Sequence, residues 1–193
     1  GGLAIGTIIA NAIMASMVGI IGAEIVTFGL IALPEMLARK YDHKLAIGSI
    51  AAGGGLATLI PPSIVFIVYG MTAGCSVGDL FIAGIIPGLL LGALFILYIL
   101  WHCWRDPESA PLASEEERNI PWRKKLAMQK KLIAPLLLAA SVLGSIYAGI
   151  ATPTEAAAMG ATGALALMIC YGRFSRRGLF EACLKTLETS SLV

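Results

Sequence analysis

The sequence is short of charge. Only 13% of its 193 residues are charged, whereas soluble domains carry about a quarter. Three long stretches hold a single charged side chain each: Glu24 in residues 1–34, Asp79 in 45–104 and Glu155 in 132–172. Apolar stretches of this length predict membrane-spanning segments and argue against a soluble domain. We therefore expect an all-α integral membrane protein that lies in a lipid bilayer.

The sequence also lacks the residue patterns of enzymes and of transition-metal sites. It contains no nucleophile elbow, phosphate loop, metal-protease pair or dinucleotide fingerprint. The spacing of the four cysteines is not of a metal-binding type, and their placement argues against a disulfide framework. They are Cys75, Cys103, Cys170 and Cys183. We therefore expect no enzyme activity, no metal of transition type and no organic cofactor.

Basic side chains are absent from one polar gap and gather in three others. Residues 39–44, 105–131 and 173–177 are basic, whereas residues 74–80 carry no Lys or Arg. The positive-inside rule places the three basic gaps in the cytoplasm and residues 74–80 outside. These clusters are explained as topology signals, so binding to nucleic acid is not expected.

The first apolar stretch, Leu3–Leu33, is too long for one ordinary span. As a single helix its 31 residues would extend about 46 Å, beyond a bilayer core of roughly 30 Å. Glycines near its centre favour a re-entrant hairpin over residues 1–34, followed by a cytoplasmic loop at 35–44. One steeply tilted span remains the alternative.

The remaining stretches predict one broken and three intact spans. Pro61 and Pro62 interrupt the apolar segment at 45–73 near its centre, which predicts a discontinuous transmembrane helix. The other elements that we expect are spans at 81–104, 132–151 and 153–171, a cytoplasmic connector at 105–131 that ends in an amphipathic helix, and a truncated amphipathic arm at 179–193. Residue 1 is glycine and an apolar segment begins at once, so we expect a piece of a longer chain.

The break at Ile60-Pro61-Pro62-Ser63 is the first candidate site. Prolines lack N–H groups, and lipid cannot satisfy the carbonyls that they release upstream. Broken helices of transporters use such carbonyls to bind sodium, and use the N-termini of their half-helices for anionic substrate groups. The Ser63 hydroxyl, at the start of the second half, can donate to an anion or accept a cation. A proline kink held by neighbouring helices is the alternative.

Glu24 is the second candidate. A lone acid inside an apolar segment is costly and is by default a functional-site hypothesis. Glu24 can act as a proton carrier, a cation ligand or the partner of a substrate amine. The alternative is a carboxyl that is buried and protonated, or one paired with a helix outside this sequence.

The segment Thr152-Pro153-Thr154-Glu155 matches a capping box. Thr152 is placed as the N-cap, Pro153 as the first helical residue and Glu155 as the third. This structural role is sufficient to explain the motif. A role of Glu155 as a coupling-ion ligand is the alternative.

Three segments together resemble the large membrane subunit of tripartite ATP-independent periplasmic (TRAP) transporters: LPEMLARKYDHKLAIGSIAAGGGLATLIPPSIVFIVYG, SVGDLFIAGIIPGLLLG and GIATPTEAAAMGA. The resemblance covers essentially the whole sequence in order. It implies a sodium-coupled, elevator-type, inverted-repeat transporter of the bacterial inner (cytoplasmic) membrane, with roughly the first repeat and the start of the second present here. It also implies a small membrane subunit, a periplasmic substrate-binding protein and a small organic acid, such as a C4-dicarboxylate, as partners.

The resemblance further implies a sodium site. In the family, the ion joins the tip of the first hairpin to the backbone at the proline pair, which carries over to Ala57, Ile60 and Pro62, mostly through carbonyls. The family's tip commonly reads like SGSS, whereas this sequence has Val18-Gly19-Ile20-Ile21 and therefore no hydroxyls. We expect Gly19, Ser63 and Glu24 to serve substrate or ion coupling, with Glu24 replacing the serine oxygens or making coupling partly proton-dependent.

The leading functional interpretation is a permease subunit of a secondary active importer. The hairpin and the broken helix would move against scaffold helices at 81–104 and 132–171. A passive channel or permease that uses the same broken helix, and a proton-coupled transporter that uses Glu24, are the alternatives. Dependence of uptake on an ion gradient separates a coupled transporter from a channel.

Overall fold

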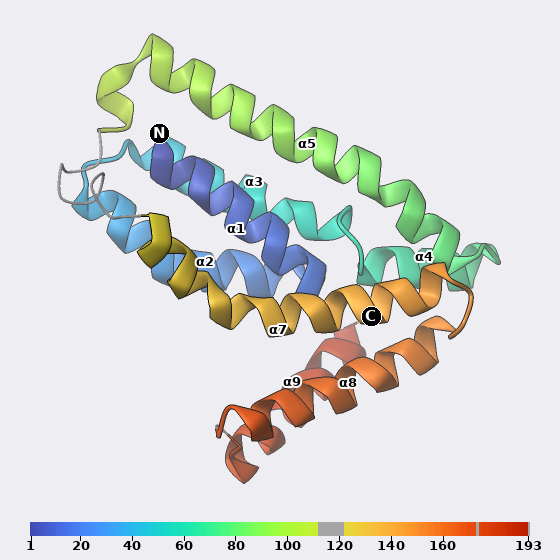
Figure 1. The fold of residues 1–193 in the computed structure, drawn as a ribbon. Coiled ribbons are helices and arrows are strands. Elements are labelled where there is room, and N and C mark those ends of the chain that lie inside the picture. The colour runs from blue at the N-terminus through green and yellow to red at the C-terminus, as the bar shows by residue number, and fades with distance from the viewer. Residues whose placement is uncertain (112–121, 173, 193) are drawn as a thin grey trace.

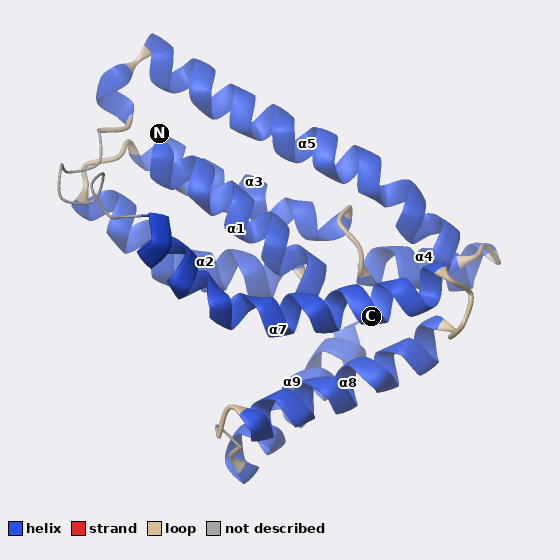
Figure 2. Ribbon diagram, viewed as in Figure 1, coloured by secondary structure: helices blue, strands red, loops and turns tan. Residues whose placement is uncertain are grey.

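The protein is built from helices joined by short turns. The computed structural model describes residues 1–111, 122–172 and 174–192, and these contain eight α-helices, two 3₁₀ turns and no strand (Figure 2). Three of the helices are long and apolar enough to cross a membrane: α2 (Ile21–Ala38), α5 (Val77–Arg105) and α8 (Pro153–Cys170). The chain is therefore an all-α membrane protein, as its low charge predicts.

The first apolar stretch forms a helical hairpin. α1 (Gly2–Val18) ends at Gly19, whose φ of 64° is left-handed and favours glycine, and α2 begins at Ile21. The two helices pack against each other and run in opposite directions (Figure 1). The single tilted span that was the alternative is not what the structure has. Whether the hairpin is re-entrant stays a prediction, because no bilayer defines its depth.

α2 continues to Ala38 and does not end at residue 34. Pro34 lies inside the helix, and the residues that follow it are good helix formers. Glu35 also pairs with Arg39 one turn later at 2.7 Å, in the spacing that supports a helix end. The loop predicted at 35–44 is therefore shorter than the composition indicates.

The next helix is broken where the prolines predict. α3 (His43–Gly55) starts at Asp42, whose carboxylate accepts hydrogen bonds from the N–H groups of Lys44 and Leu45. It passes into a 3₁₀ turn, η1 (Leu56–Thr58), and the chain becomes extended at Ser63 before α4 (Ile64–Ala73) begins. The apolar segment therefore forms two successive half-helices, α3 and α4, with the break between them.

α5 is an uninterrupted helix that ends in an aromatic group. Tyr98 and Trp101 have ring centroids 6.1 Å apart, and the Arg105 guanidinium lies 5.7 Å from the Trp101 ring. Aromatic and basic residues together are typical of a membrane–water interface. A short 3₁₀ turn, η2 (Pro107–Ser109), follows α5.

The last three helices are α7 (Trp122–Tyr147), α8 and α9 (Arg176–Leu192). α7 runs through residue 131, so the amphipathic helix of the connector and the span predicted to start at 132 are one helix and not two. No Gly or Pro separates these segments before Pro135, which explains the continuity. The centre of the predicted connector, 112–121, lies outside the described residues. α9 carries the amphipathic arm predicted at 179–193.

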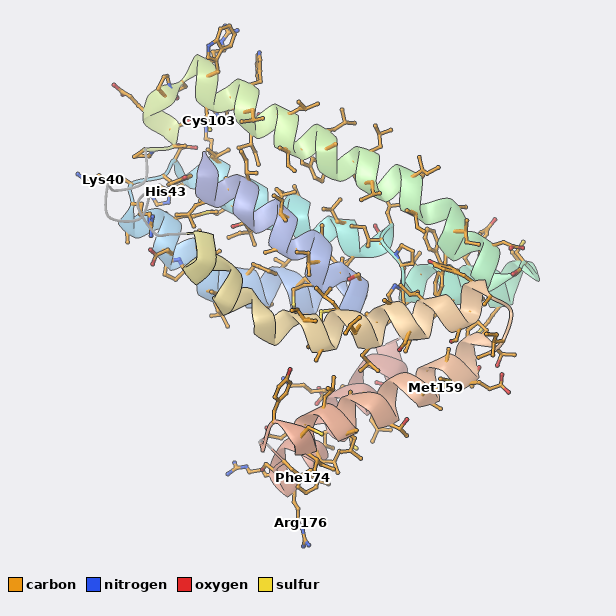
Figure 3. The ribbon with its side chains drawn as sticks, viewed as in Figure 1. Lys40, His43, Cys103, Met159, Phe174 and Arg176 are labelled. Carbon is orange, nitrogen blue, oxygen red and sulfur yellow. The ribbon has the colours of Figure 1, made fainter. Side chains whose placement is uncertain are left out.

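The turns fall at two opposite ends of the molecule. The α4–α5 turn and the α7–α8 turn lie at one end, and the α2–α3 and α8–α9 turns lie toward the other (Figure 1). Lys40 and His43 project at the α2–α3 turn, and Arg176 projects at the α8–α9 turn (Figure 3). The basic turns are thus separated from the two turns that lack basic residues, which agrees with the topology inferred from charge.

The Thr152 motif forms a capping box at the start of α8. The Glu155 carboxylate accepts from the Thr152 N–H at 2.8 Å, and the Thr152 hydroxyl accepts from the Glu155 N–H at 3.4 Å. Pro153 occupies the first helical turn, where its missing N–H costs nothing. This exposed turn lies away from the proline break, so its geometry is that of a helix start.

Glycines bring α5 against the break. A Cβ on Gly84 would collide with the Phe66 ring and would lie 2.7 Å from the Leu59 carbonyl oxygen. One turn later, a Cβ on Gly88 would lie 3.0 Å from the Ile60 side chain, and a Cβ on Gly92 would lie 3.7 Å from Leu56. Contact between α5 and the broken helix is therefore closest at Gly84 and becomes ordinary at Gly92.

We expect Gly84→Ala to destabilise the purified protein and Gly92→Ala to leave it nearly unchanged. Both substitutions add the same methyl group to the same helix, but only Gly84 faces a backbone oxygen that cannot move aside. Overpacking of this kind costs about 1–3 kcal/mol. Apparent melting temperatures in detergent measure the difference, and equal values for the two variants would contradict the close packing.

We expect Thr152→Ala to loosen the first turn of α8. Loss of an N-cap hydroxyl costs about 1 kcal/mol, which corresponds to roughly fivefold faster amide exchange in that turn. Hydrogen–deuterium exchange measured by mass spectrometry follows the peptide that contains Glu155. Thr152→Ser keeps the hydroxyl and is the matched control; exchange that is the same in both variants would show that the cap is not needed.

Candidate functional site

The tip of the hairpin lies on the proline break. A Cβ on Gly19 would collide with the carbonyl oxygen of Pro62 and would lie 3.7 Å from the Cα of Ser63. Both α1 and α2 also contact η1. The structure therefore brings together Gly19 and the break, two segments that the sequence separates by more than forty residues.

The proline pair leaves two carbonyls, those of Ala57 and Thr58, without their helical donors. The Leu56 carbonyl accepts from the N–H groups of both Leu59 and Ile60, at 3.0 and 2.9 Å. The Ala57 and Thr58 carbonyls would take N–H groups four residues later, but those residues are Pro61 and Pro62. A side chain donates to the Thr58 carbonyl, whereas Ala57 is buried and its carbonyl accepts no such bond from the described residues. Its carbonyl is available to a cation.

Ser63 supplies the repair. Its side chain is fully buried, and its hydroxyl donates to the Thr58 carbonyl at 2.8 Å. It makes no capping bond to α4. A hydroxyl has one proton to donate, so the lone pairs of Ser63 remain as acceptors. This arrangement suits a cation, and it leaves Ser63 no proton for an anionic substrate.

Ile60 and Pro62 face different neighbours. Ile60 packs against Gly88 of α5, whereas the Pro62 carbonyl points at the hairpin tip. The Pro61–Pro62 peptide is cis. The five residues predicted for the tip and the break, Gly19, Ala57, Ile60, Pro62 and Ser63, thus lie around one point of the fold.

Glu24 lies in the first turn of α2, just beyond the tip. Only 1% of its surface is exposed, and neither carboxylate oxygen has a hydrogen-bond partner among the described residues. α2 packs against α1, α3 and η1. Glu24 thus lies in the interior of the hairpin cluster, and its carboxylate makes no hydrogen bond to the break within the described residues.

Asn11 is a polar residue that the sequence interpretation missed. It is fully buried in the middle of α1, and its side-chain N–H donates to the Thr7 carbonyl at 2.9 Å. Its amide oxygen has no partner among the described residues. The signal in the sequence is an amide inside an apolar stretch. Burying an unpaired amide costs free energy, as burying Glu24 does, although less than burying a charge.

A cavity of about 390 Å³ lies beside the break. Pro62 and two residues next to the tip, Ser16 and Met17, line one side. The opposite side consists of apolar residues of α7 and α8, among them Leu138 and Ala164, together with Tyr171. The break therefore borders an open space where it faces α7 and α8, in contrast to its close contact with α5.

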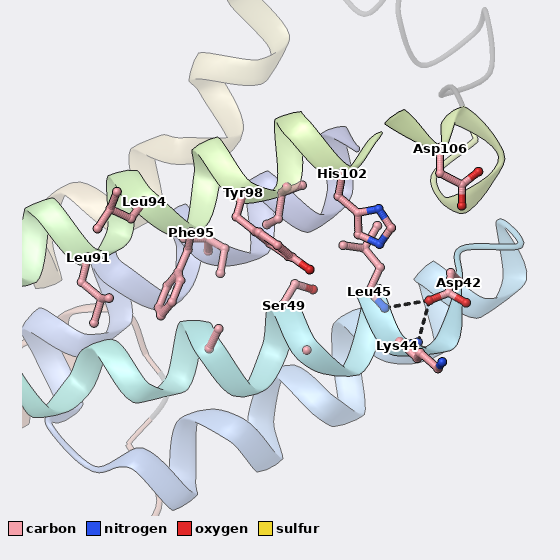
Figure 4. Close-up of a pocket in the computed structure, with 14 residues that line it drawn as sticks. Asp42, Lys44, Leu45, Ser49, Leu91, Leu94, Phe95, Tyr98, His102 and Asp106 are labelled. Atoms are coloured by element: carbon pink, nitrogen blue, oxygen red, sulfur yellow. Dashed lines mark hydrogen bonds between the residues drawn. The ribbon is translucent and has the colours of Figure 1, made fainter. Parts of the chain in front are cut away.

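A larger pocket of about 850 Å³ lies between α3 and α5. Phe95 and Tyr98 of α5 face Ser49 of α3 across it, and His102 and Asp106 lie at one end (Figure 4). None of the predicted site residues lines this pocket. No group of three or more His, Cys, Asp or Glu side chains suited to a metal ion occurs in the part of the chain that the structure describes.

Comparison with known proteins identifies a family. Residues 1–193 match the family described as tripartite ATP-independent periplasmic transporter, DctM component. The chain is 40% identical over 163 residues to the C4-dicarboxylate TRAP transporter large permease protein of Pseudomonas aeruginosa, which covers 83% of this chain and 36% of that relative. It is 38% identical over 161 residues to the protein of that name from Vibrio cholerae, covering 83% and 34%.

A third relative has another substrate in its name. The chain is 33% identical over 200 aligned positions to the 2,3-diketo-L-gulonate TRAP transporter large permease protein of Escherichia coli, covering 100% of this chain and 44% of that relative. All three relatives are named as permeases, which are transport proteins and not enzymes. The chain spans between about a third and a little under half of their lengths. By the match over its whole length, this chain belongs to the DctM family of TRAP transporter large permeases.

Proposed function

We propose that the chain forms part of a secondary active importer of small organic acids that is driven by sodium. The observation that supports this most directly is the contact of the hairpin tip with the Pro62 carbonyl. A cation that binds there touches two separate segments at once, so its presence or absence changes how they fit together. Relatives named for a C4-dicarboxylate and for a diketo sugar acid support an organic acid as the cargo.

The sodium ligands in this proposal are mainly backbone oxygens. The Ala57 carbonyl lacks its helical donor, the Pro62 carbonyl faces Gly19, and Ile60 lies between them in the chain. Ser63 contributes acceptor lone pairs, because its only proton is already donated to Thr58. Oxygen ligands of this kind suit a hard monovalent cation and need no serine at the tip.

The family membership also supports the assembly proposed for the whole protein. A large permease of a tripartite transporter works with a small membrane subunit and a periplasmic substrate-binding protein, in the inner membrane of a bacterium. The binding protein delivers the organic acid to the outer side. The large subunit, of which this chain is one part, then moves the acid and the sodium ion inward.

We further propose that α5 belongs to the moving part, because it packs closely on the broken helix. The sequence interpretation grouped residues 81–104 with the scaffold helices, but α5 meets Leu59, Ile60 and Phe66 of the broken helix through glycines. α7 and α8 are instead separated from Pro62 by a cavity. We propose that α1 to α5 move together, and that the sliding boundary lies along this cavity.

We expect Gly19→Ala to weaken sodium-driven uptake. The added methyl group displaces the Pro62 carbonyl from the tip, and we expect the sodium concentration for half-maximal uptake to rise about tenfold, the loss of roughly 1.4 kcal/mol of ion binding. The assay uses proteoliposomes that contain the complete large subunit, its small partner and the binding protein, with an imposed sodium gradient. A wild-type uptake that ignores the gradient would favour a passive channel and overturn the proposed coupling.

Gly74→Ala is the matched control for this variant. Gly74 also has a left-handed φ, 67°, against 64° at Gly19, so both substitutions cost about 1–2 kcal/mol of backbone strain. No atom lies within 4 Å of a Cβ at Gly74. A loss of sodium affinity in both variants would attribute the effect to strain and not to the tip–break contact.

Cross-links can test the proposed boundary in the same proteoliposomes. In a variant without Cys75, Cys103, Cys170 and Cys183, we expect a bifunctional thiol reagent to stop transport when it joins Met17→Cys to Ala164→Cys across the cavity. Joining Leu56→Cys to Gly92→Cys, which face each other within the proposed moving part, leaves most transport intact. The opposite pattern would return α5 to the scaffold.

A further inference from the structure

Three acceptor oxygens are buried in the hairpin without any donor. They are Oε1 and Oε2 of Glu24 and Oδ1 of Asn11, and each lacks a hydrogen-bond partner among the described residues. Their side chains are 1% and 0% exposed. Buried acceptors are almost always paired, so three of them in one helix cluster indicate that a proton, a donor or a cation binds there.

Asn11 and Ile25, the residue that follows Glu24, meet α3 at neighbouring glycines. A Cβ on Gly53 would lie 2.6 Å from the side-chain nitrogen of Asn11, and a Cβ on Gly54 would lie 3.4 Å from the backbone nitrogen of Ile25. The peptide that joins Glu24 to Ile25 therefore lies directly against Gly54. α1 and α2 approach the same two residues of α3 because glycine leaves room for them.

The orientation of the Asn11 amide is fixed by its neighbour. The Thr7 carbonyl lies 2.9 Å from the Asn11 side-chain nitrogen, and a carbonyl can only accept. The N–H group must therefore face Thr7, which leaves Oδ1 as the free atom. Asn11 therefore offers one neutral oxygen ligand, on the helix that packs against α2.

Among the described helices that pack against α2, none places a basic side chain beside Glu24. α1 and η1, which pack against α2, contain no charged residue. The third neighbour, α3, has its titratable groups, His43 and Lys44, in its first turn, at the end away from Gly53 and Gly54. On α2 itself the other acid is Glu35, more than two turns farther along the helix. An unpaired buried carboxylate is strongly unfavourable, so the carboxyl holds either a proton or a cation.

We propose that Glu24 and Asn11 form a cation site in which sodium and a proton compete for the Glu24 carboxylate. In the exchange, sodium binds to the carboxylate and to Asn11 Oδ1, and the carboxylic acid releases its proton to water. The charge of the site therefore rises by one when either cation binds to the carboxylate and is unchanged when one replaces the other. The site is distinct from the break, because neither residue belongs to it, and it depends on the proposed transport function only for the identity of the ion.

The experiment is sodium binding to the purified complete transporter at pH 6 and pH 8, measured with ²²Na⁺. We expect wild-type affinity to weaken toward pH 6, up to about tenfold for each pH unit, the limit for exchange of one proton for one cation. Glu24→Gln removes the competing proton, and the pH-dependent component of binding disappears. Asn11→Leu keeps the shape of the side chain but weakens binding at both pH values.

Glu35→Gln is the matched control for the loss of an acid on the same helix, because Glu35 is exposed and pairs with Arg39. It should keep the wild-type pH dependence. If Glu24→Gln does not fold, Glu24→Asp keeps a carboxylate, and infrared difference spectra can follow the loss of a protonated carboxyl band on addition of sodium. We expect the frequency of this band to differ between wild type and Glu24→Asp. If sodium removes no protonated carboxyl band from the wild-type spectrum, the proposal is overturned.

The two possible failures are distinguishable. Sodium binding that is equal at pH 6 and pH 8, or that keeps its pH dependence in Glu24→Gln, rejects the Glu24 site but leaves the break site intact. Uptake that ignores the sodium gradient in wild type rejects the proposed coupling itself. Binding that depends on pH while uptake ignores sodium would support the Glu24 site and reject sodium-driven transport.

Discussion

The loss of two adjacent backbone donors inside an apolar helix determines how this protein is arranged. Pro61 and Pro62 deprive the carbonyls of Ala57 and Thr58 of their partners, and lipid offers no substitute. The two carbonyls have different fates. Thr58 accepts the Ser63 hydroxyl, whereas Ala57 is enclosed by the hairpin and keeps its oxygen available. A broken helix of this kind can exist at membrane depth only when other elements surround it.

The surrounding elements reach the break through glycines. Gly19 comes from the hairpin tip, and Gly84 and Gly88 come from α5, and at each position a Cβ would meet backbone or side-chain atoms of the break. Backbone packed this closely excludes lipid from the polar groups of residues 59–63. The same contacts join the hairpin, the broken helix and α5 into one body. The cavity beside Pro62 marks where this close packing stops.

The sequence predicts where the helices lie along the chain better than it predicts which helices pack together. Sparse charge separates the apolar segments, the proline pair locates the break, and Thr152 with Glu155 marks the start of α8, because each of these signals acts within a few residues. The grouping of α5 with the break is not predictable in this way. Its face toward the break and its faces away from it are all apolar, so hydropathy does not distinguish a helix neighbour from lipid.

Two features of the site could be recognised only from the three-dimensional structure. Ser63 could bond forward to α4 or back to Thr58, and only the backbone geometry at the break selects the second. Asn11 looks like an isolated amide in the sequence, and its meaning appears when α3 brings Gly53 beside it. Helix ends were misjudged for a simpler reason, since Pro34 and the boundary near residue 131 are both tolerated inside continuous helices.

The hairpin tip shows how position and charge can be supplied by different residues. Gly19 provides the close approach to Pro62, but the tip residues Gly19, Ile20 and Ile21 bring neither a hydroxyl nor a charge to it. The carbonyls of the break are neutral dipoles, so they orient a cation without cancelling its charge. Glu24 is the only charged residue in residues 1–34, and the break at residues 56–63 contains none. Under the proposed function, the carboxyl in the first turn of α2 places a countercharge inside the same packed body as the ion.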